Sequence, residues 1–483
     1  MPPVVRRPSS SLLPVLLAVA GALSCSRGTS PEAPRVRNVV LILVDTLRPD
    51  HLGAYGYGRP TSPAIDALAA RGVVFENAFA QAPWTTPSIA SLLGGLYPAA
   101  MDMGFWSDPG GPGRVAEAVE TLAEVVRAGG IRTHAITARG GTNAEFGFGQ
   151  GFEVYDDDAG YVQLTLERAE AFLDGLGDDE RFFLYLHTYD VHNFNPPGEY
   201  REMFVEPYRG DLLPKERLNK FLQGGTTRLE ARSFGEAEWR HVKSLYDACI
   251  RNVDDQIARL VDTLRARGRL DDTLILVTAD HGEEFGEHGS SGHGYAMYDE
   301  SIRVPLILAH PSLVPARVDP QVRLLDVAPT LAALLGLAPS ETWQGSDLSP
   351  LLEGRALSLP VFVECAHNSL KAMRVESPRP RKLIVGQGRP KGHLFALDVD
   401  PGETESRHGH PDEREVLVAM KEAMLRWVRT NARLAERFSG REGEEDGMSV
   451  EAQEEMEAFG YVGAGKKAGG RGEFDWEAAL TGG

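Results

Sequence analysis

The stretch NVVLILVDT, residues 38–46, decides the fold, because it is short, rich in β-branched residues and apolar on both faces. RFFLYLHTYDVH (181–192) and DTLILVTADHG (272–282) have the same pattern. Such runs are typical of strands that are buried on both faces of a parallel sheet. Between them lie helical patterns such as VDDQIARLVDTLRARG (253–268), which Gly268 closes. The alternation predicts an α/β fold, with a mostly parallel sheet sandwiched by helices.

Each of the three runs ends in residues that can bind a ligand. The first ends in Asp45, the second in Asp190 and His192, and the third in Asp280 and His281. Ligand sites of parallel sheets lie beyond the carboxyl ends of the strands, so we expect these side chains to meet at one edge. A single acidic strand end usually caps the next helix, but three such ends together indicate a site.

Two buried carboxylates, Asp45 and Asp280, would repel each other unless positive charge lay between them. A divalent cation is the simplest way to neutralise them, and His281 adds an imidazole ligand. Imidazole favours Mn²⁺ or Zn²⁺ over Ca²⁺, which prefers oxygen ligands. We therefore expect one divalent metal ion at this edge of the sheet.

A hydroxyl that can complete this metal site lies in QAPWTTPSIASLLGG, residues 81–95. Thr86 followed by Pro87 predicts a helix start, with Thr86 as the N-cap and Pro87 at the first helical position. Thr85 then lies just outside the helix, beside the positive end of its dipole. Thr85 is therefore either an ordinary turn residue or a nucleophile that a metal ion activates.

The composition excludes some classes of function. A net charge of −19 without a long basic stripe argues against nucleic acid as a partner. An anionic substrate must then be held by local positive charge, against the field of the whole protein. A chain of 483 residues exceeds one ordinary core, which predicts one large domain with a smaller one.

The first 25 residues have the pattern of a bacterial export signal. Two arginines precede an apolar run over 12–23 that is too short to span a bilayer. Cys25 follows Ala-Leu-Ser, which is close to a lipoprotein box, so Cys25 is either lipidated or incidental to ordinary cleavage nearby. Both alternatives predict a protein exported from the cytoplasm, periplasmic or lipid-anchored to the membrane. Cys249 and Cys365 could pair in an oxidising compartment, but two cysteines do not form a disulfide framework.

Longer motifs follow one another in the order that the sulfatase family shows. They are NVVLILVDTLRPDHLGAYGYGRPTSPAIDALAARGVVFENAFAQAPWTTPSIASLLGGLYP (38–98), FFLYLHTYDVHNFNPP (182–197), DHGEEFGEHGSSGHGYAMYDESIRVPLIL (280–308), LLDVAPTLAALLGL (324–337), LFALDVDPGE (394–403) and FGYVG (459–463). Over most of residues 38–463 the chain therefore resembles the sulfatase family, within the alkaline phosphatase superfamily. The motifs are specific for the family and much less specific for the substrate.

The resemblance implies roles for individual residues. The positions of the family's metal ligands are Asp45, Thr85, Asp280 and His281. The residues that hold the substrate anion or protonate the leaving group fall on His192 and on His293, where sulfatases often have a lysine. The resemblance gives His288 a structural or supporting role and makes His187 buried scaffold. Asn143 either lines the pocket or forms a turn.

The departures from the family matter as much as the matches. Sulfatases have cysteine or serine at the position of Thr85, which is oxidised to formylglycine. Threonine cannot give that aldehyde, because its β-carbon carries a methyl group, so no formylglycine is expected. The family's arginine four residues on is Ile89, its second aspartate beside Asp45 is Thr46, and its usual lysine has no counterpart over 139–143. A phosphorylated threonine can be resolved by water or another alcohol, whereas a sulfated one requires attack at sulfur.

We therefore expect a metal-dependent hydrolase of phosphate or sulfate esters, the phosphate ester favoured, with Thr85, His192 and His293 as catalytic residues. The substrate is an anionic ester of a small molecule, a glycan or a lipid. A transferase of phosphoglycerol type is the alternative, and a binding protein on a decayed scaffold is the third, which the intact metal ligands oppose. A second metal ion, held by Asp190 with the two histidines, matches the spacing of two-metal relatives poorly.

The expected organisation has five parts: an export signal at 1–25, a linker at 26–37, a sulfatase-like catalytic domain at 38–355, a C-terminal α+β subdomain at 356–463 and a disordered tail at 464–483. The subdomain contains the strand patterns KAMRV (371–375), RKLIV (381–385) and HLFAL (393–397), with a helix around 415–438. We expect these strands to form a small sheet of their own, and edge elements of the main sheet are the alternative.

Overall fold

The first strand of the chain lies at the centre of the main sheet. In the computed structural model, β1 (Asn38–Val44) pairs in parallel with β5 (Phe182–Thr188) on one side and β6 (Thr273–Thr278) on the other. Every residue of these three strands is buried. The three apolar runs of the sequence are therefore adjacent strands, and their carboxyl ends point to one edge.

The structure describes residues 36–103, 113–205, 234–365, 369–386, 388–438 and 476–481. The predicted export signal with Cys25, the linker up to residue 35 and the FGYVG motif at 459–463 lie outside these ranges. Among the residues that are described, no helix is both long enough and apolar enough to cross a membrane.

The main sheet is mostly parallel, as the sequence predicts. Its strand order is β10-β2-β9-β6-β1-β5-β3-β4, with β11 beside β2. Only β9 runs antiparallel to its neighbours among the strands described. The remaining strands of this sheet are β2 (Val73–Phe79), β3 (Arg132–Ile136), β4 (Val154–Asp156), β9 (Arg303–Ala309), β10 (Ala316–Val318) and β11 (Val322–Arg323).

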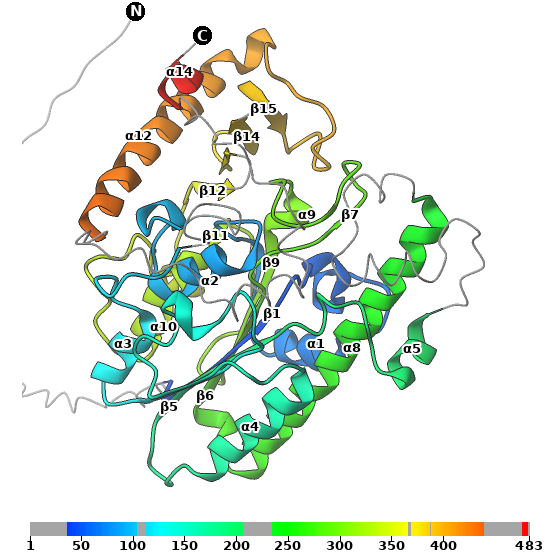
Figure 1. Ribbon diagram of the computed structural model, residues 1–483, viewed down its shortest axis with the longest axis vertical. Coiled ribbons are helices and arrows are strands. Elements are labelled where there is room, and N and C mark those ends of the chain that lie inside the picture. The colour runs from blue at the N-terminus through cyan, green and yellow to red at the C-terminus, as the bar shows by residue number, and fades with distance from the viewer. Residues whose placement is uncertain are drawn as a thin grey trace, which may run out of the picture. The chain divides into compact units, whose positions relative to one another are not determined.

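Helices cover both faces of this sheet (Figure 1). One face carries α1 (Pro63–Ala70), α4 (Val162–Asp174) and α8 (Glu236–Ala266), and both α1 and α4 contact α8. The short helix α5 (Gly198–Phe204) also packs on α8. The other face carries α2 (Thr85–Gly94), α3 (Leu122–Ala128) and α10 (Val327–Leu334). The longest of these helices, α8, buries an apolar residue every three or four positions, which is why it lies flat on the sheet.

The C-terminal strands form a sheet of their own rather than extending the main one. This antiparallel sheet has the order β12-β13-β14-β15, and α12 (Arg414–Phe438) packs against it. Its strands are β12 (Val361–Cys365), β13 (Leu370–Val375), β14 (Arg381–Gly386) and β15 (Arg389–Ala396). Shorter elements of the chain are β7 (Glu284–Phe285), β8 (Ser291–Gly292), α9 (Asp299–Ile302) and α11 (Ser349–Leu352).

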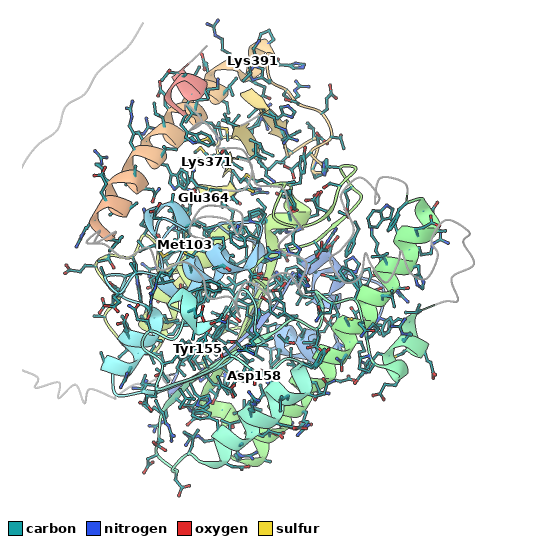
Figure 2. The ribbon with its side chains drawn as sticks, in the orientation of Figure 1. Met103, Tyr155, Asp158, Glu364, Lys371 and Lys391 are labelled. Atoms are coloured by element: carbon teal, nitrogen blue, oxygen red, sulfur yellow. The ribbon has the colours of Figure 1, made fainter. Side chains whose placement is uncertain are left out.

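The expectation of a disordered tail over 464–483 is wrong for Trp476–Thr481, which forms α14. Leu480 is buried in the core between α12 and the small sheet. The ammonium group of Lys371 lies 4.9 Å from the ring centroid of Trp476 and 5.1 Å from that of Trp427, and 2.8 Å from a carboxylate oxygen of Glu364 (Figure 2). One apolar side chain and one cation–π contact thus hold α14 in place.

Hydrogen bonds and ion pairs connect the small sheet to loops of the main sheet beside α2. The backbone N–H of Glu364 donates to the carbonyl of Gln81 at 3.0 Å, and the Cys365 thiol donates to the carbonyl of Gly294 at 2.9 Å. Lys382 is fully buried between Asp299 at 2.9 Å and Glu403 at 2.8 Å. Cys249 and Cys365 are both buried free thiols, so the disulfide that the sequence left open is not formed.

Candidate active site

The carboxyl ends of β1 and β6 bring three ligand-bearing side chains together. Asp45 follows β1 directly, and Asp280 and His281 follow β6, the strand beside it. All three are completely buried, and each offers one ligand atom within 4.8 Å of the others. The sequence prediction that these residues meet at one edge of the sheet is therefore confirmed.

The donor atoms at this point suit a cation. Asp45 Oδ1 and Asp280 Oδ2 are buried without a hydrogen-bond partner in the described part of the chain. The His281 Nδ1–H donates to the carbonyl of Gly282 at 2.9 Å, so Nε2 carries the lone pair. That nitrogen lies 3.3 Å from Asp280 Oδ2, which places two electron-rich atoms side by side. A divalent ion would satisfy both and the orphaned oxygens with them.

The electrostatics of the cluster lead to the same conclusion. Burial, and then the charge of Asp280, raise the pKa of Asp45 well above its ordinary value. Burial also raises the pKa of Asp280. Burial, and then the neighbouring His293, lower the pKa of His281, which keeps its ring neutral and able to ligate. Without a cation, this site holds two carboxylates whose ionisation is strongly disfavoured.

Thr46 shapes the site through its backbone, a role that the sequence did not indicate. Its φ of 57° is in the left-handed region, where a β-branched residue is uncommon. In this conformation its N–H donates to Asp280 Oδ1 at 3.2 Å, while its carbonyl accepts from the Tyr246 hydroxyl at 2.7 Å. Strain held in this way clusters at functional sites. Thr46 thus orients Asp280 by a backbone contact.

Thr85 lies at the first position of α2 with its hydroxyl inside the metal cluster. Its Oγ1 donates to Asp45 Oδ2 at 3.2 Å and lies 3.3 Å from His281 Nε2. Ser88, one turn further along α2, donates to the carbonyl of Asp280 at 2.6 Å and holds the helix against β6. The structure therefore brings Thr85 to the two carboxylates and the imidazole of the candidate metal site.

The predicted helix start is wrong by two residues. The helix begins at Thr85, and the N-cap is Trp84 in extended conformation, not Thr86. The Thr86 hydroxyl does not cap the helix, because it donates to the carbonyl of Gly141 at 3.0 Å. A partner 55 residues away along the chain has replaced the local capping bond.

His187 lies closer to the ligands than its expected scaffold role implied. It is completely buried, and its Nε2 is 3.5 Å from Asp45 Oδ2. Burial lowers the pKa of His187 to about 4, so the ring is neutral at pH 7. Its position inside β5 fixes one side of Asp45.

His192 and His293 meet beside the metal cluster. Their ring centroids are 5.0 Å apart, and the His293 ring is 4.4 Å from that of His281. The His293 Nδ1–H donates to Glu283 at 3.1 Å. Burial alone would lower the pKa of His293, but the carboxylates around it, Glu283 first, outweigh burial and raise it. Burial and then the charge of His293 lower the pKa of His192, so the pKa values of the two rings shift in opposite directions.

Asp190 does not belong to this cluster. One of its oxygens accepts hydrogen bonds from the Thr188 hydroxyl and from the N–H of Val162 at 2.8 Å, and the other accepts from Asn252 at 3.3 Å. Its carboxylate therefore holds the start of α4 instead of facing the histidines. The second metal ion, to which Asp190 would contribute, finds no support in this geometry.

Two further residues have structural contacts. Asn143 accepts from the N–H of Glu145 at 2.9 Å in a turn, which is one of its two expected roles. His288 lies between Glu300 at 2.6 Å and the carbonyl of Gly402 at 3.1 Å. Its ring stacks on Tyr298 with centroids 3.5 Å apart. His288 therefore connects the loop after β6 to the C-terminal region.

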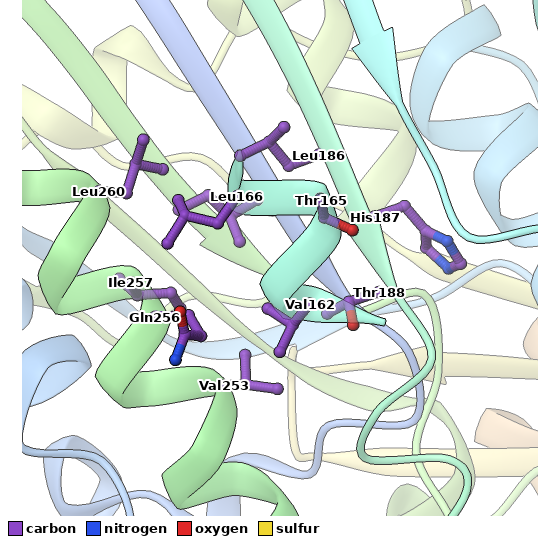
Figure 3. Close-up of a pocket in the computed structure, with 11 residues that line it drawn as sticks. Val162, Thr165, Leu166, Leu186, His187, Thr188, Val253, Gln256, Ile257 and Leu260 are labelled. Atoms are coloured by element: carbon purple, nitrogen blue, oxygen red, sulfur yellow. The ribbon is translucent and has the colours of Figure 1, made fainter. Parts of the chain in front are cut away.

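A separate apolar cavity lies behind the site, between α4, α8 and the sheet (Figure 3). Its walls come mainly from Val162, Leu166, Leu186, Val253 and Ile257. None of the metal-cluster residues lines it, and no charged side chain does either. Its polar groups come from Thr165, His187, Thr188 and Gln256, and no lysine or arginine lines it, so it offers an anionic ester no fixed positive charge.

Comparison with known families agrees with the geometry. The sulfatase family model matches residues 37–337, and the model of the C-terminal region of N-sulphoglucosamine sulphohydrolase matches residues 286–430. The first match contains Asp45, Thr85, Asp280 and His281. The second includes the small antiparallel sheet.

Individual relatives are similar over most of the chain. Human arylsulfatase A is 31% identical over 375 residues, which cover 71% of each chain. The uncharacterised sulfatase YidJ of Escherichia coli is 28% identical over 369 residues, 66% of this chain and 72% of its own. The phosphonate monoester hydrolase of Agrobacterium radiobacter has the same fold, with a TM-score of 0.67, 21% identity and coverage of 82% of this chain and 96% of its own. The chain belongs to the sulfatase family of metal-dependent ester hydrolases, within the alkaline phosphatase superfamily.

Proposed function

We propose that this hydrolase cleaves phosphate esters, with the hydroxyl of Thr85 as the nucleophile. The observation that carries the proposal is the position of that hydroxyl, 3.2 Å from Asp45 and 3.3 Å from His281. Thr85 also begins α2, where the helix dipole favours an attacked phosphoryl group. Its β-carbon carries a methyl group, which prevents oxidation to formylglycine.

The proposed cofactor is one divalent transition ion, Mn²⁺ or Zn²⁺ more readily than Ca²⁺. Asp45, Asp280, His281 and Thr85 would hold it, and the imidazole of His281 is the basis of the preference. When bound, such an ion supplies Lewis-acid stabilisation of negative charge and lowers the pKa of a ligated hydroxyl. No formylglycine is part of this proposal.

The reaction proceeds in two steps. The Thr85 hydroxyl passes its proton to Asp45 Oδ2, to which it donates at 3.2 Å, as its oxygen attacks phosphorus and the bond to the substrate alcohol breaks, leaving a phosphothreonine. His293, which Glu283 holds at 3.1 Å, donates a proton to the departing alcohol, and His192 lies beside it to contact the anion. Water then attacks phosphorus and gives one proton to His293, while the bond from phosphorus to the Thr85 oxygen breaks. Asp45 returns its proton to that oxygen, so the products are the alcohol and the free phosphate or phosphomonoester.

The choice of phosphate over sulfate rests on the second step. A phosphothreonine is resolved by attack of water at phosphorus, whereas a sulfated threonine lacks the second hydroxyl through which a formylglycine hydrate expels sulfate. A fold neighbour named as a phosphonate monoester hydrolase accommodates a phosphorus ester on the same scaffold. The organic part of the proposed substrate is a small molecule or a glycan, and the proposed location is outside the cytoplasm, with Cys25 as a lipid anchor.

Substitution of Thr85 tests the nucleophile. Thr85→Ala and Thr85→Val should lower turnover of bis(4-nitrophenyl) phosphate by at least about three orders of magnitude, the scale of removing a catalytic-triad member. Ser91→Ala is the matched control, because Ser91 is a buried hydroxyl on the same helix without a hydrogen-bond partner in the described residues. A phosphorylated Thr85 trapped at low pH would support the mechanism. Retained activity in Thr85→Ala, or far better turnover of aryl sulfates than of phosphates by the unmodified chain, would contradict it.

A further inference from the structure

The loop after β3 touches Thr85 through a glycine whose backbone is fixed on both sides. The N–H of Gly141 donates to the Tyr189 hydroxyl at 2.8 Å, and its carbonyl accepts from the Thr86 hydroxyl at 3.0 Å. Tyr189 follows β5 and Thr86 belongs to α2, so two separate elements hold the peptide. All four side-chain and backbone groups involved are buried. Gly141 therefore has little freedom to move away from Thr85.

A side chain at position 141 would crowd this threonine. A Cβ added to Gly141 would lie 3.0 Å from both Cβ and Cγ2 of Thr85 and 3.2 Å from Thr86 Oγ1. Carbon atoms pack at about 3.5–4.0 Å, so such a contact requires something to shift. The neighbouring Gly140 has a φ of 89° and would meet the Tyr189 hydroxyl at 3.0 Å, so the loop has no space on that side either.

The methyl group and the hydroxyl of Thr85 share one carbon atom, so they turn together. Gly141 lies against the methyl side, while the hydroxyl contacts Asp45 and His281. A rotation about χ1 that moved the methyl group away from residue 141 would also move the hydroxyl away from the metal ligands. Branched side chains of this kind have few rotamers to choose from.

We propose that Gly141 is a positioning residue for Thr85, and that threonine at position 85 requires glycine at position 141. The backbone of Gly141 packs against the methyl group of Thr85, and this contact orients the Thr85 hydroxyl toward Asp45 and His281. A serine at position 85 lacks the methyl group and does not need the same contact. The inference rests on the proposed function, because it takes Thr85 to be the reacting group.

A double-mutant cycle tests the proposal. Gly141→Ala should lower kcat for bis(4-nitrophenyl) phosphate by about 100-fold, the scale expected when a reacting group is misplaced by about 1 Å. KM and metal content should stay near their starting values, since the ligands from β1 and β6 are untouched. In the Thr85→Ser background the same Gly141→Ala change should cost clearly less than it does with threonine, because the contact with Cγ2 is gone while the one with Cβ remains. Intact mass verifies that the introduced serine is unmodified.

Gly149→Ala is the matched control, because an added Cβ there meets Tyr155 at an ordinary 3.6 Å. It should leave kcat unchanged. If Gly141→Ala is silent, or if it costs as much with serine at position 85 as with threonine, the positioning role is refuted. Failure of the proposed function gives a different pattern, namely full activity in Thr85→Ala. The two failures are therefore distinguishable in one set of variants.

Discussion

Removing two of the metal ligands together, in an Asp280→Ala/His281→Ala variant, should abolish binding of the divalent ion. The ligand atoms of the cluster lie within 4.8 Å of one another. Two carboxylate charges at that separation repel by about 3.5 kcal/mol at an effective dielectric constant of 20. A cation between Asp45 and Asp280 removes this repulsion, so the wild-type chain has a strong reason to bind one and the variant has none.

The expected change in thermal stability follows from the binding. An ion present at 100 times its Kd stabilises the folded state by about 2.7 kcal/mol. Unfolding roughly 370 ordered residues carries an entropy of about 2.1 cal/mol/K per residue, so this stabilisation raises Tm by about 3–4 °C. The double variant should show no rise in Tm when Mn²⁺ or Zn²⁺ is added.

Elemental analysis and a thermal scan with and without the ion measure both effects. A Glu287→Ala/His288→Ala variant is the control, because it removes an adjacent carboxylate and imidazole from the same loop but leaves the cluster intact. Its metal content should equal that of the wild type. Equal metal content in the Asp280→Ala/His281→Ala variant and the wild type would refute the assignment of the ligands.

The pH dependence of binding gives a second measurement of the same site. Burial and the charge of Asp280 raise the pKa of Asp45, so the ion-free site retains a proton at a pH where an exposed aspartate has lost it. Binding must displace that proton, and affinity should therefore fall as pH falls. His281 is held neutral by burial and does not compete. Titration calorimetry in two buffers should show that binding releases protons, and no release would contradict this account.

Two other predictions concern regions away from the site. Mass spectrometry of the mature protein from its native host should find diacylglycerol on Cys25 or a new amino terminus nearby, and an intact Met1 would exclude export by this signal. Lys382→Met should lower the free energy of unfolding by about 3–5 kcal/mol at pH 8, because it leaves Asp299 and Glu403 buried without their shared cation. Burial raises the pKa of Glu403 to about 7, so Glu403 takes up a proton toward pH 5. The loss of unfolding free energy, measured by urea titration, should therefore be smaller at pH 5 than at pH 8. An unchanged stability at pH 8 would contradict this prediction.

The sequence was sufficient to predict the sheet and the meeting of Asp45, Asp280 and His281 at its edge, because both depend on local pattern. A strand buried on both faces must be apolar throughout, so NVVLILV was recognisable, and the polar residue after it had to lie at the edge of the sheet. The same argument placed Asp280 and His281 beside Asp45. The small C-terminal sheet was also predicted from its strands, and the structure confirms it as a sheet of its own.

The sequence did not predict the contacts that orient the side chains of the site. The hydrogen bond from His293 to Glu283 joins positions ten residues apart in a loop without periodic pattern. The left-handed conformation of Thr46 and the bond from Thr86 to Gly141 both depend on partners that only the fold brings near. Local capping rules failed at Thr86 because a distant carbonyl competed for the same hydroxyl.

The central position of β1 has a consequence for how the chain acquires its structure. Its two neighbours come much later in the sequence, since Val39 pairs with Phe183 and Asn38 with Thr273. Closing loops of this length is slow, and until then the first strand presents two open edges. Its apolar, uncharged sequence is of the kind that pairs with other chains when exposed. During folding, NVVLILV is therefore open to pairing with other chains until Phe182–Thr188 and Thr273–Thr278 cover its two edges.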